Sequence, residues 1–132
     1  MLFRLKSYND DYYRIYEKRQ KVQLDTIPSY SWIKAQAEVS DNSRVLDAGC
    51  GTGEVLNFLC QNTSAKGVGV DISEFAMRIA HEKYPRFEYH ACDLTKLPFQ
   101  DDFFDVIVCF NVIEHIQNQD EVLRELRRVL SP

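Results

Sequence analysis

The sequence has no long apolar run, and none of its hydrophobic stretches reaches the roughly 18 residues that a membrane-spanning helix needs. The N-terminus carries charges but lacks the apolar core of a cleavable signal peptide. A basic excess is also missing, because 16 Lys and Arg face 20 Asp and Glu and the net charge is −4. Duplex nucleic acids require a basic surface that neutralises their phosphates. We therefore expect a cytoplasmic protein that binds neither a membrane nor a nucleic acid.

The sequence also lacks any Cys-x-x-Cys pair and any histidine at metal-ligand spacing from a cysteine. Its four cysteines lie far apart, at Cys50, Cys60, Cys92 and Cys109. Such spacing favours reduced, buried thiols over a zinc site or a disulfide framework. We expect no metal ligands among them.

Glycine is scarce, with five residues in the whole chain, yet three of them alternate at Gly49, Gly51 and Gly53. They follow a segment, 44–48, that holds a short apolar run and the acidic Asp47, and they precede an amphipathic segment. This order predicts a strand, a tight turn and the start of a helix. The missing side chains permit positive φ and let a ligand approach the main chain and the helix amides closely.

Glycine-rich turns of this kind bind either dinucleotides or adenosyl cofactors. A dinucleotide fingerprint needs a small residue where this chain has Glu54. A carboxylate at the helix start would also repel a pyrophosphate. A nicotinamide-dependent dehydrogenase is therefore the least favoured alternative.

Residues 45–53 resemble the first motif of the class I S-adenosylmethionine-dependent methyltransferases. Further matches follow in the expected order. Asp71 ends a second apolar strand, Asp93 follows a third, and the segment 97–115 resembles the family's fourth strand with its lead-in and exit. Together the matches cover about residues 44–131, and four ordered matches are more specific than one glycine loop.

The resemblance implies S-adenosylmethionine as cofactor and in-line methyl transfer to a small-molecule acceptor. It places the methionine moiety at Asp47 and the glycine loop, the ribose at Asp71 and the adenine near Asp93, with Asn111 facing the methionine end and the acceptor. The cofactor-binding residues implied in this way are Asp47, Ala48, Gly49, Cys50, Gly51, Gly53, Asp71, Ile72, Asp93, Leu94 and Asn111.

Ordinary structural roles compete with several of these assignments. Asp47 is also suited to a cap or a salt bridge, and Asp93 to a turn, where aspartate is common. Ile72 either covers the adenine or enters the core. Cys50 is a buried thiol or, less favoured, a reactive one.

Glu114 and His115 form a candidate acid/base pair. Some quinone-pathway methyltransferases that resemble this segment hold a metal with a Glu-x-x-Glu-His cluster, but Asn111 replaces the first glutamate here. We therefore expect no metal site. His115 is a candidate general base because its ordinary pKa is near 6.5, and the alternative is a helix-start residue that bonds nearby backbone.

The periodicity predicts two regions. Residues 1–39 form an N-terminal helical cap, whose second helix begins at Pro28, and residues 40–132 form the cofactor-binding core. In the core, strands near 44–48, 66–71, 87–92 and 105–110 alternate with helices near 53–61, 74–84 and 119–130. This alternation predicts an α/β fold with a Rossmann-like parallel sheet and helices on both faces, and the resemblance implies strand order 3-2-1-4.

Local signals define several helix ends. Ser73 is a predicted N-cap, and Asn118 with Glu121 resembles a capping box. Arg127 and Arg128 are expected to complement the dipole of the last helix. The apolar residues of that helix are predicted to pack on the sheet as one stripe, namely Val122, Leu123, Leu126, Val129 and Leu130.

The family sheet normally has seven strands, and this sequence ends after the helix that follows the fourth. We expect a fragment or a shortened form of a longer protein, whose fourth strand has an exposed apolar edge and supports a homo-oligomer. A cofactor-binding but inactive fragment or partner subunit is the alternative function. The N-terminal tyrosines at positions 8, 12, 13 and 16 are predicted to close over the cofactor or contact the substrate.

Overall fold

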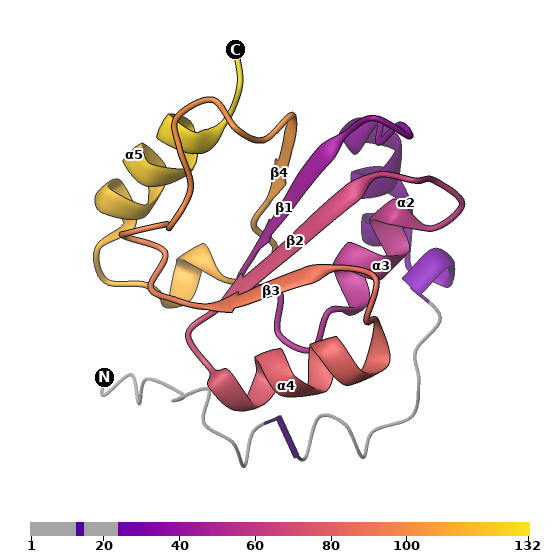
Figure 1. Ribbon diagram of the computed structural model, residues 1–132, viewed down its shortest axis with the longest axis horizontal. Coiled ribbons are helices and arrows are strands. Elements are labelled where there is room, and N and C mark those ends of the chain that lie inside the picture. The colour runs from indigo at the N-terminus through magenta and orange to yellow at the C-terminus, as the bar shows by residue number, and fades with distance from the viewer. Residues whose placement is uncertain (1–12, 15–23) are drawn as a thin grey trace.

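The computed structural model describes residues 13, 14 and 24–132 (Figure 1). In chain order its elements are η1 (Leu24–Thr26), α2 (Pro28–Ala37), β1 (Arg44–Ala48), α3 (Glu54–Cys60), β2 (Lys66–Asp71), α4 (Glu74–Lys83), β3 (Glu88–Ala91), β4 (Val106–Val108), η2 (Ile113–His115) and α5 (Gln119–Val129). No helix among the described residues is long and apolar enough to cross a bilayer.

The four strands form one parallel sheet in the order β3-β2-β1-β4, which confirms the predicted α/β class and strand order. In β1, Val45 faces a cluster with Leu56 of α3, whereas Leu46 faces a cluster with Val122 of α5. Successive side chains of a strand point to opposite faces, so helices cover both sides of the sheet. Figure 1 shows α5 and α3 on opposite sides.

Helices α4 and α5 both begin where predicted, but the capping bond predicted for α5 is absent. Ser73 caps α4, because its hydroxyl accepts a hydrogen bond of 3.1 Å from the Ala76 amide. Asn118 occupies the N-cap position of α5, yet its side chain makes no capping bond. Its backbone, at φ −94° and ψ 55°, lies outside the extended region from which an N-cap side chain reaches the following amides. The capping-box prediction was wrong.

The apolar stripe of α5 is narrower than predicted. Val122 and Val129 are fully buried and Leu126 packs against the same cluster, but Leu123 is 52% exposed. Leu123 follows Val122 directly, so a turn of about 100° carries it away from the sheet.

Arg128 does more than complement a helix dipole. Its guanidinium pairs with Glu125 and Asp101, each at 2.7 Å, and donates to the carbonyls of Leu97 and Phe99. These bonds fasten the lead-in to β4 onto α5.

The edge strand β4 ends earlier than predicted. It spans Val106–Val108, and its side chains are half-buried. The chain turns away soon afterwards, since Asn111 has a positive φ of 55°. On the side of β4 that faces away from β1, the backbone pairing found within residues 24–132 is a single β-bridge. It joins Phe104, just before β4 begins, to Leu130.

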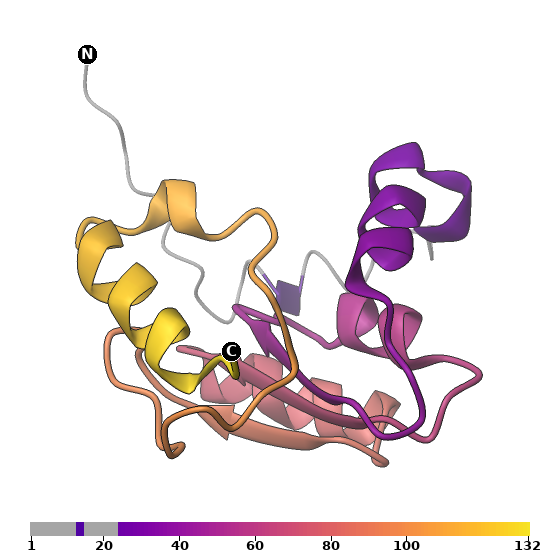
Figure 2. The ribbon, with the colours of Figure 1, turned by 90° about the horizontal axis from the view of Figure 1, so that it is seen from above.

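The N-terminal region is described in part. The helix predicted to begin at Pro28 is present as α2, which Figure 2 shows projecting from the rest of the fold. None of its residues is buried, and Trp32 is 65% exposed. Of the four predicted N-terminal tyrosines, Tyr13 is described, and the other three lie outside the described residues.

Candidate functional site

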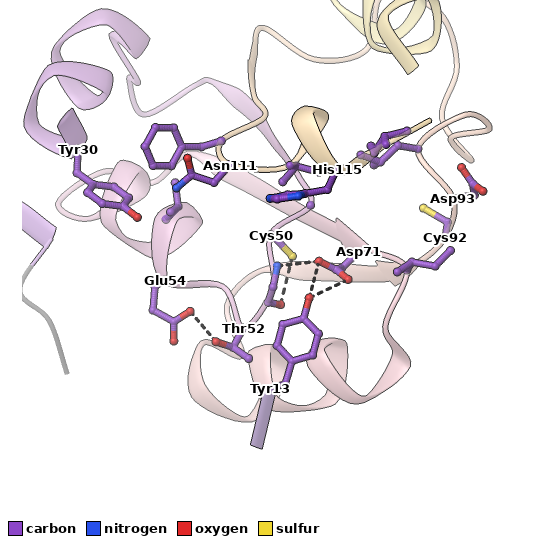
Figure 3. Close-up of a pocket in the computed structure, with 18 of the residues that line it drawn as sticks. Tyr13, Tyr30, Cys50, Thr52, Glu54, Asp71, Cys92, Asp93, Asn111 and His115 are labelled. Atoms are coloured by element: carbon purple, nitrogen blue, oxygen red, sulfur yellow. Dashed lines mark hydrogen bonds between the residues drawn. The ribbon is translucent and has the colours of Figure 1, made fainter. Parts of the chain in front are cut away.

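A cavity of about 460 Å³ lies at the carboxyl ends of β1, β2 and β4 (Figure 3). Ligands of open parallel sheets bind at this edge, where the strand order reverses between neighbours. Here the reversal falls between β1 and β4, since β2 lies on one side of β1 and β4 on the other. The turns that follow these strands supply most of the lining.

The turn after β1 is held in the conformation that the three glycines predicted, with positive φ at Gly49, Gly51 and Gly53. At Gly49 a Cβ atom would stand 2.4 Å from a methyl carbon of Val112, so any side chain would force Val112 to shift. The amides of Gly49 and Cys50 both donate to the Val70 carbonyl, at 2.7 and 2.9 Å. The loop is thus fixed against the end of β2.

Asp71 ends β2 and is 7% exposed. Its Oδ2 accepts from the Gly51 amide and its Oδ1 from the Ser73 amide, each at 3.0 Å. The Tyr13 hydroxyl donates to both oxygens at 3.2 Å, as Figure 3 shows. One carboxylate therefore joins the glycine loop, the start of α4 and the N-terminal region.

Asp47 lies near the end of β1, just before the glycine loop, and is 2% exposed. Its Oδ2 has no hydrogen-bond partner among the described residues. Burial, with repulsion from Asp71, raises the pKa of Asp47 to about 7. It forms no ion pair in the described part of the chain, so the salt-bridge alternative finds no support there. An orphaned buried carboxylate is costly unless a donor or cation reaches it, and the ammonium group of an adenosyl amino acid is of that kind.

Glu54 begins α3 and lines the cavity. Its carboxylate accepts a hydrogen bond of 2.6 Å from the Thr52 hydroxyl and pairs with Lys83. Lys83 comes from the end of α4, so this pair ties the glycine loop to that helix. The position that a dinucleotide fingerprint reserves for a small residue is filled by a charged one.

Nine of the twelve predicted site residues line the cavity, namely Gly49, Cys50, Gly51, Asp71, Ile72, Asp93, Leu94, Asn111 and His115. Asp47, Ala48 and Gly53 do not. Ala48 is fully buried against the α5 side of the core, because strand alternation turns its side chain away from the cavity. Gly53 lies under Tyr84 and Tyr89 at the start of α3.

The predicted alternatives separate in three cases. Ile72 is 65% exposed and lines the cavity, so it does not enter the core. Asp93 accepts from the amide and hydroxyl of Thr95, each at 2.8 Å, and therefore forms an ordinary turn while also lining the cavity. Burial and nearby carboxylates raise the pKa of Cys50 well above its ordinary value, which disfavours a reactive thiolate.

His115 ends η2 at the rim of the cavity. Its backbone amide donates to the Val112 carbonyl at 3.0 Å, which is a bond within this turn and not the helix-start role of the alternative. Its ring nitrogen lies 3.8 Å from the Glu114 carboxylate. No three His, Cys, Asp or Glu side chains cluster as metal ligands within the described part of the chain.

Sequence reasoning missed about half of the lining. Thr52 and Glu54 belong to the glycine loop, and Phe110 and Val112 flank Asn111, so proximity to a predicted residue would have found these four. Tyr30 comes from α2, and its ring meets that of Phe110 edge-on with centroids 5.0 Å apart. The sequence carries no signal for that contact. The remaining lining residues missed are Leu24, Val55, Cys92 and Ile116.

Residues 45–132 match the family model described as a methyltransferase domain. The chain belongs to this family. A sterol 4-C-methyltransferase from Caenorhabditis elegans is 36% identical over 119 residues, and the match covers 86% of this chain and 35% of that protein. A demethylmenaquinone methyltransferase from Chlorobaculum parvum is 30% identical, with 75% of this chain and 41% of that protein covered.

The methyltransferase fold extends to solved structures. A SAM-dependent methyltransferase from Aquifex aeolicus superposes with a TM-score of 0.78 at 21% identity, over 95% of this chain and 69% of that one. The [4+2]-cyclase SpnF superposes with a TM-score of 0.77 at 23% identity, over 86% of this chain and 44% of that one. The family uses S-adenosylmethionine, which decides against the dehydrogenase. This methyltransferase chain spans about a third of the length of the curated relatives it matches.

Proposed function

We propose that this chain binds S-adenosylmethionine in the cavity over β1, β2 and β4 and directs its methyl group toward a small-molecule acceptor. The observation that carries the proposal is the Asp71 carboxylate, which lines the cavity at the end of β2 and is fixed by the Gly51 and Ser73 amides. A carboxylate in this place is suited to accept both hydroxyls of a ribose.

The other residues divide along the cavity. Figure 3 shows Asp93 at one end and Tyr30 and Glu54 at the other, with Asp71 between them. We assign the adenine to the end with Asp93, Leu94 and Ile72, and the methionine moiety to the glycine loop. Asp47 lies close enough to that loop to raise the pKa of Cys50, and its orphaned oxygen suits the ammonium group.

When bound, the cofactor supplies an electrophilic methyl group on a sulfonium centre. The chain's own contribution is to orient the two reactants and exclude water, and orientation supplies up to roughly 7–11 kcal/mol of a barrier. Asn111 and His115 lie over the middle of the cavity in Figure 3 and are assigned to the acceptor side. His115 is the proposed proton acceptor for a hydroxyl or amine.

A small molecule is favoured as acceptor for two reasons. The matched relatives are named for a sterol and a demethylmenaquinone as substrates. The rings of Tyr30 and Phe110 also give one end of the cavity an aromatic wall that suits an apolar compound. The carboxylates of Asp71, Asp93 and Glu54 make the described lining unsuited to a polyanion such as a nucleic acid.

An assay of methyl transfer tests the activity. The chain is incubated with S-adenosylmethionine labelled in the methyl group and a panel of sterols, quinols, phenols and amines, and the label in each acceptor is counted. The proposal is supported if the chain transfers label to an acceptor and His115→Gln transfers less than wild type while it still binds the cofactor. Cofactor binding without transfer to any acceptor supports the alternative of an inactive, cofactor-binding subunit.

Two further proposals concern the setting of the chain. All four cysteines are free, which supports a reducing, cytoplasmic compartment. The outer side of β4 beyond Phe104 has no backbone partner within residues 24–132, and its apolar side chains support association of two chains edge to edge.

A further inference from the structure

The Tyr13 side chain is built into the cavity wall. It is 5% exposed, and it packs in a cluster with Cys50 of the glycine loop and with Ala76, Met77 and Ala80 of α4. Its ring stands 3.5 Å from the position that a Cβ atom on Gly51 would occupy. Tyr13 therefore lies between the glycine loop and α4, directly against Asp71.

The Tyr13 hydroxyl is shared between the two oxygens of Asp71. Both distances are 3.2 Å, and Figure 3 shows the hydroxyl approaching the carboxylate between Oδ1 and Oδ2. A ribose whose two neighbouring hydroxyls donate to one carboxylate, one to each oxygen, would use the same pair of oxygens.

Asp71 also accepts hydrogen bonds from two backbone amides. A carboxylate offers about four acceptor positions, two on each oxygen. The Gly51 amide takes one position on Oδ2 and the Ser73 amide one on Oδ1, both at 3.0 Å. The Tyr13 hydroxyl donates to both oxygens, so a ribose that needs the same two oxygens has to displace it.

We propose that Tyr13 and the ribose of the adenosyl cofactor compete for Asp71, so that the free protein satisfies its own ribose-binding carboxylate. This inference rests on the proposed function, in which Asp71 binds the ribose. The Tyr13 hydroxyl leaves Asp71 before the cofactor binds. The observed affinity for the cofactor is therefore lower than the intrinsic one, because only the molecules in which Tyr13 has left the carboxylate can bind it. For Tyr13 this proposal replaces the predicted contact with the cofactor by competition with it.

The test is Tyr13→Phe, measured by calorimetry and stopped-flow binding of S-adenosylhomocysteine. The variant keeps the ring but releases Asp71, so affinity rises about tenfold, the value expected for one hydrogen bond to a charged group. Because competition affects the free protein alone, the gain lies in a faster association rate with an unchanged dissociation rate. The free variant is also less stable than wild type, since Asp71 loses a partner.

Tyr89→Phe is the matched control. Tyr89 packs against the same cluster, and its hydroxyl donates to the Tyr84 carbonyl at 3.3 Å, but it does not line the cavity. Its removal leaves the affinity and both rates unchanged. A tenfold gain in this control would assign the effect to loosened packing and overturn the role of the Tyr13 hydroxyl.

Other outcomes are equally decisive. Weaker binding in Tyr13→Phe, or a faster dissociation rate, would show that Tyr13 holds the bound cofactor, and unchanged constants would show no competition. Failure of the proposed function itself gives a different result. Wild type and Tyr13→Phe would then both fail to bind S-adenosylhomocysteine, or would both bind it with an affinity that Asp71→Asn does not change.

A second measurement needs no loss of the hydroxyl. With 3-fluorotyrosine at position 13, the fluorine NMR signal reports the place of the ring. Adenosine, which carries the ribose hydroxyls, shifts the signal to that of a displaced ring, whereas adenine alone at equal occupancy leaves it in place. An unmoved signal in the adenosine complex would overturn the proposal.

Discussion

Asp47 and Asp71 stand on adjacent parallel strands, and repulsion from Asp71 adds to burial in raising the pKa of Asp47 to about 7. Both carboxyl groups are almost fully buried, but their partners differ. Asp71 accepts bonds from three groups, whereas one oxygen of Asp47 has none among the described residues. The site thus holds one satisfied and one unsatisfied carboxylate.

The first prediction concerns stability and pH. The pKa of Asp47 is about 7 in the folded chain and 3.8 in the unfolded one, so the folded state binds more protons in this window. The free energy of unfolding therefore falls as pH rises from about 4 to 7. Asp47→Asn removes this loss and is more stable than wild type at pH 8, by an amount on the order of a few kcal/mol. Urea unfolding at pH 5 and pH 8 checks it, and an equal difference at both would contradict it.

The second prediction concerns cofactor affinity and pH. A bound ammonium group favours the charged form of Asp47, so binding of S-adenosylmethionine releases protons near pH 7 and tightens between pH 6 and 8. Calorimetry in buffers of different ionisation enthalpy measures the proton count. Asp47→Asn binds more weakly and loses the dependence, and a wild-type affinity that stays constant over this range argues against Asp47 as the ammonium partner.

The third prediction tests the glycine loop. In Gly49→Ala the new methyl group meets Val112 and the backbone φ is 82°, so we expect a loss of about 3 kcal/mol or more. Gly51→Ala is the comparison, because among the described residues its Cβ meets the Tyr13 ring alone, at 3.5 Å. It carries the cost of its positive φ, about 1–2 kcal/mol. Thermal and urea unfolding give both values, and similar losses would mean that the Val112 contact is unimportant.

The fourth prediction separates two neighbouring arginines. Arg128→Met breaks the bonds that fasten the lead-in of β4 to α5, at a cost of about 1–3 kcal/mol. Arg127→Met is the control, since Arg127 donates only to the Leu130 carbonyl in the described part of the chain. Equal destabilisation by the two substitutions would leave a dipole effect as the explanation.

The fifth prediction concerns the sheet edge. The Phe104 amide donates to the Val129 carbonyl, on the side of the chain that faces away from β1. Backbone amides two residues apart in a strand point to the same side, so the Val106 amide also faces away from β1. Proline is tolerated on an edge strand whose amide faces outward. We expect wild type to dimerise at micromolar concentration in light scattering, and Val106→Pro to remain folded and monomeric. A monomeric wild type would refute the edge-pairing proposal.

Local structure was predicted best at positions where the backbone conformation requires one particular type of residue. Gly49 needs a positive φ against Val112, and Ser73 caps α4, so both the turn and the helix start were readable. The strand order came from family resemblance, because the alternation of strands and helices alone fixes only a parallel sheet.

Long-range contacts were not predictable. Tyr13 meets Asp71 across 58 positions, and Arg128 reaches the 97–101 segment across about 30. No local pattern encodes such distances. Leu123 was predicted to be buried because the stripe was inferred from hydrophobicity without the helical angle of each residue. Ala48 and Gly53 lie outside the cavity lining, because a motif does not tell lining residues from those that shape the turn.

The measurement that tests the account most directly is a calorimetric titration of the chain with S-adenosylhomocysteine, in wild type and in Asp71→Asn. The control variant is Asp41→Asn, whose carboxylate also accepts a backbone amide, from Ser64, but lies outside the cavity. The account predicts micromolar binding in wild type and Asp41→Asn, with a loss of tenfold or more in Asp71→Asn. Equal binding by all three proteins would contradict the assignment of the ribose to Asp71.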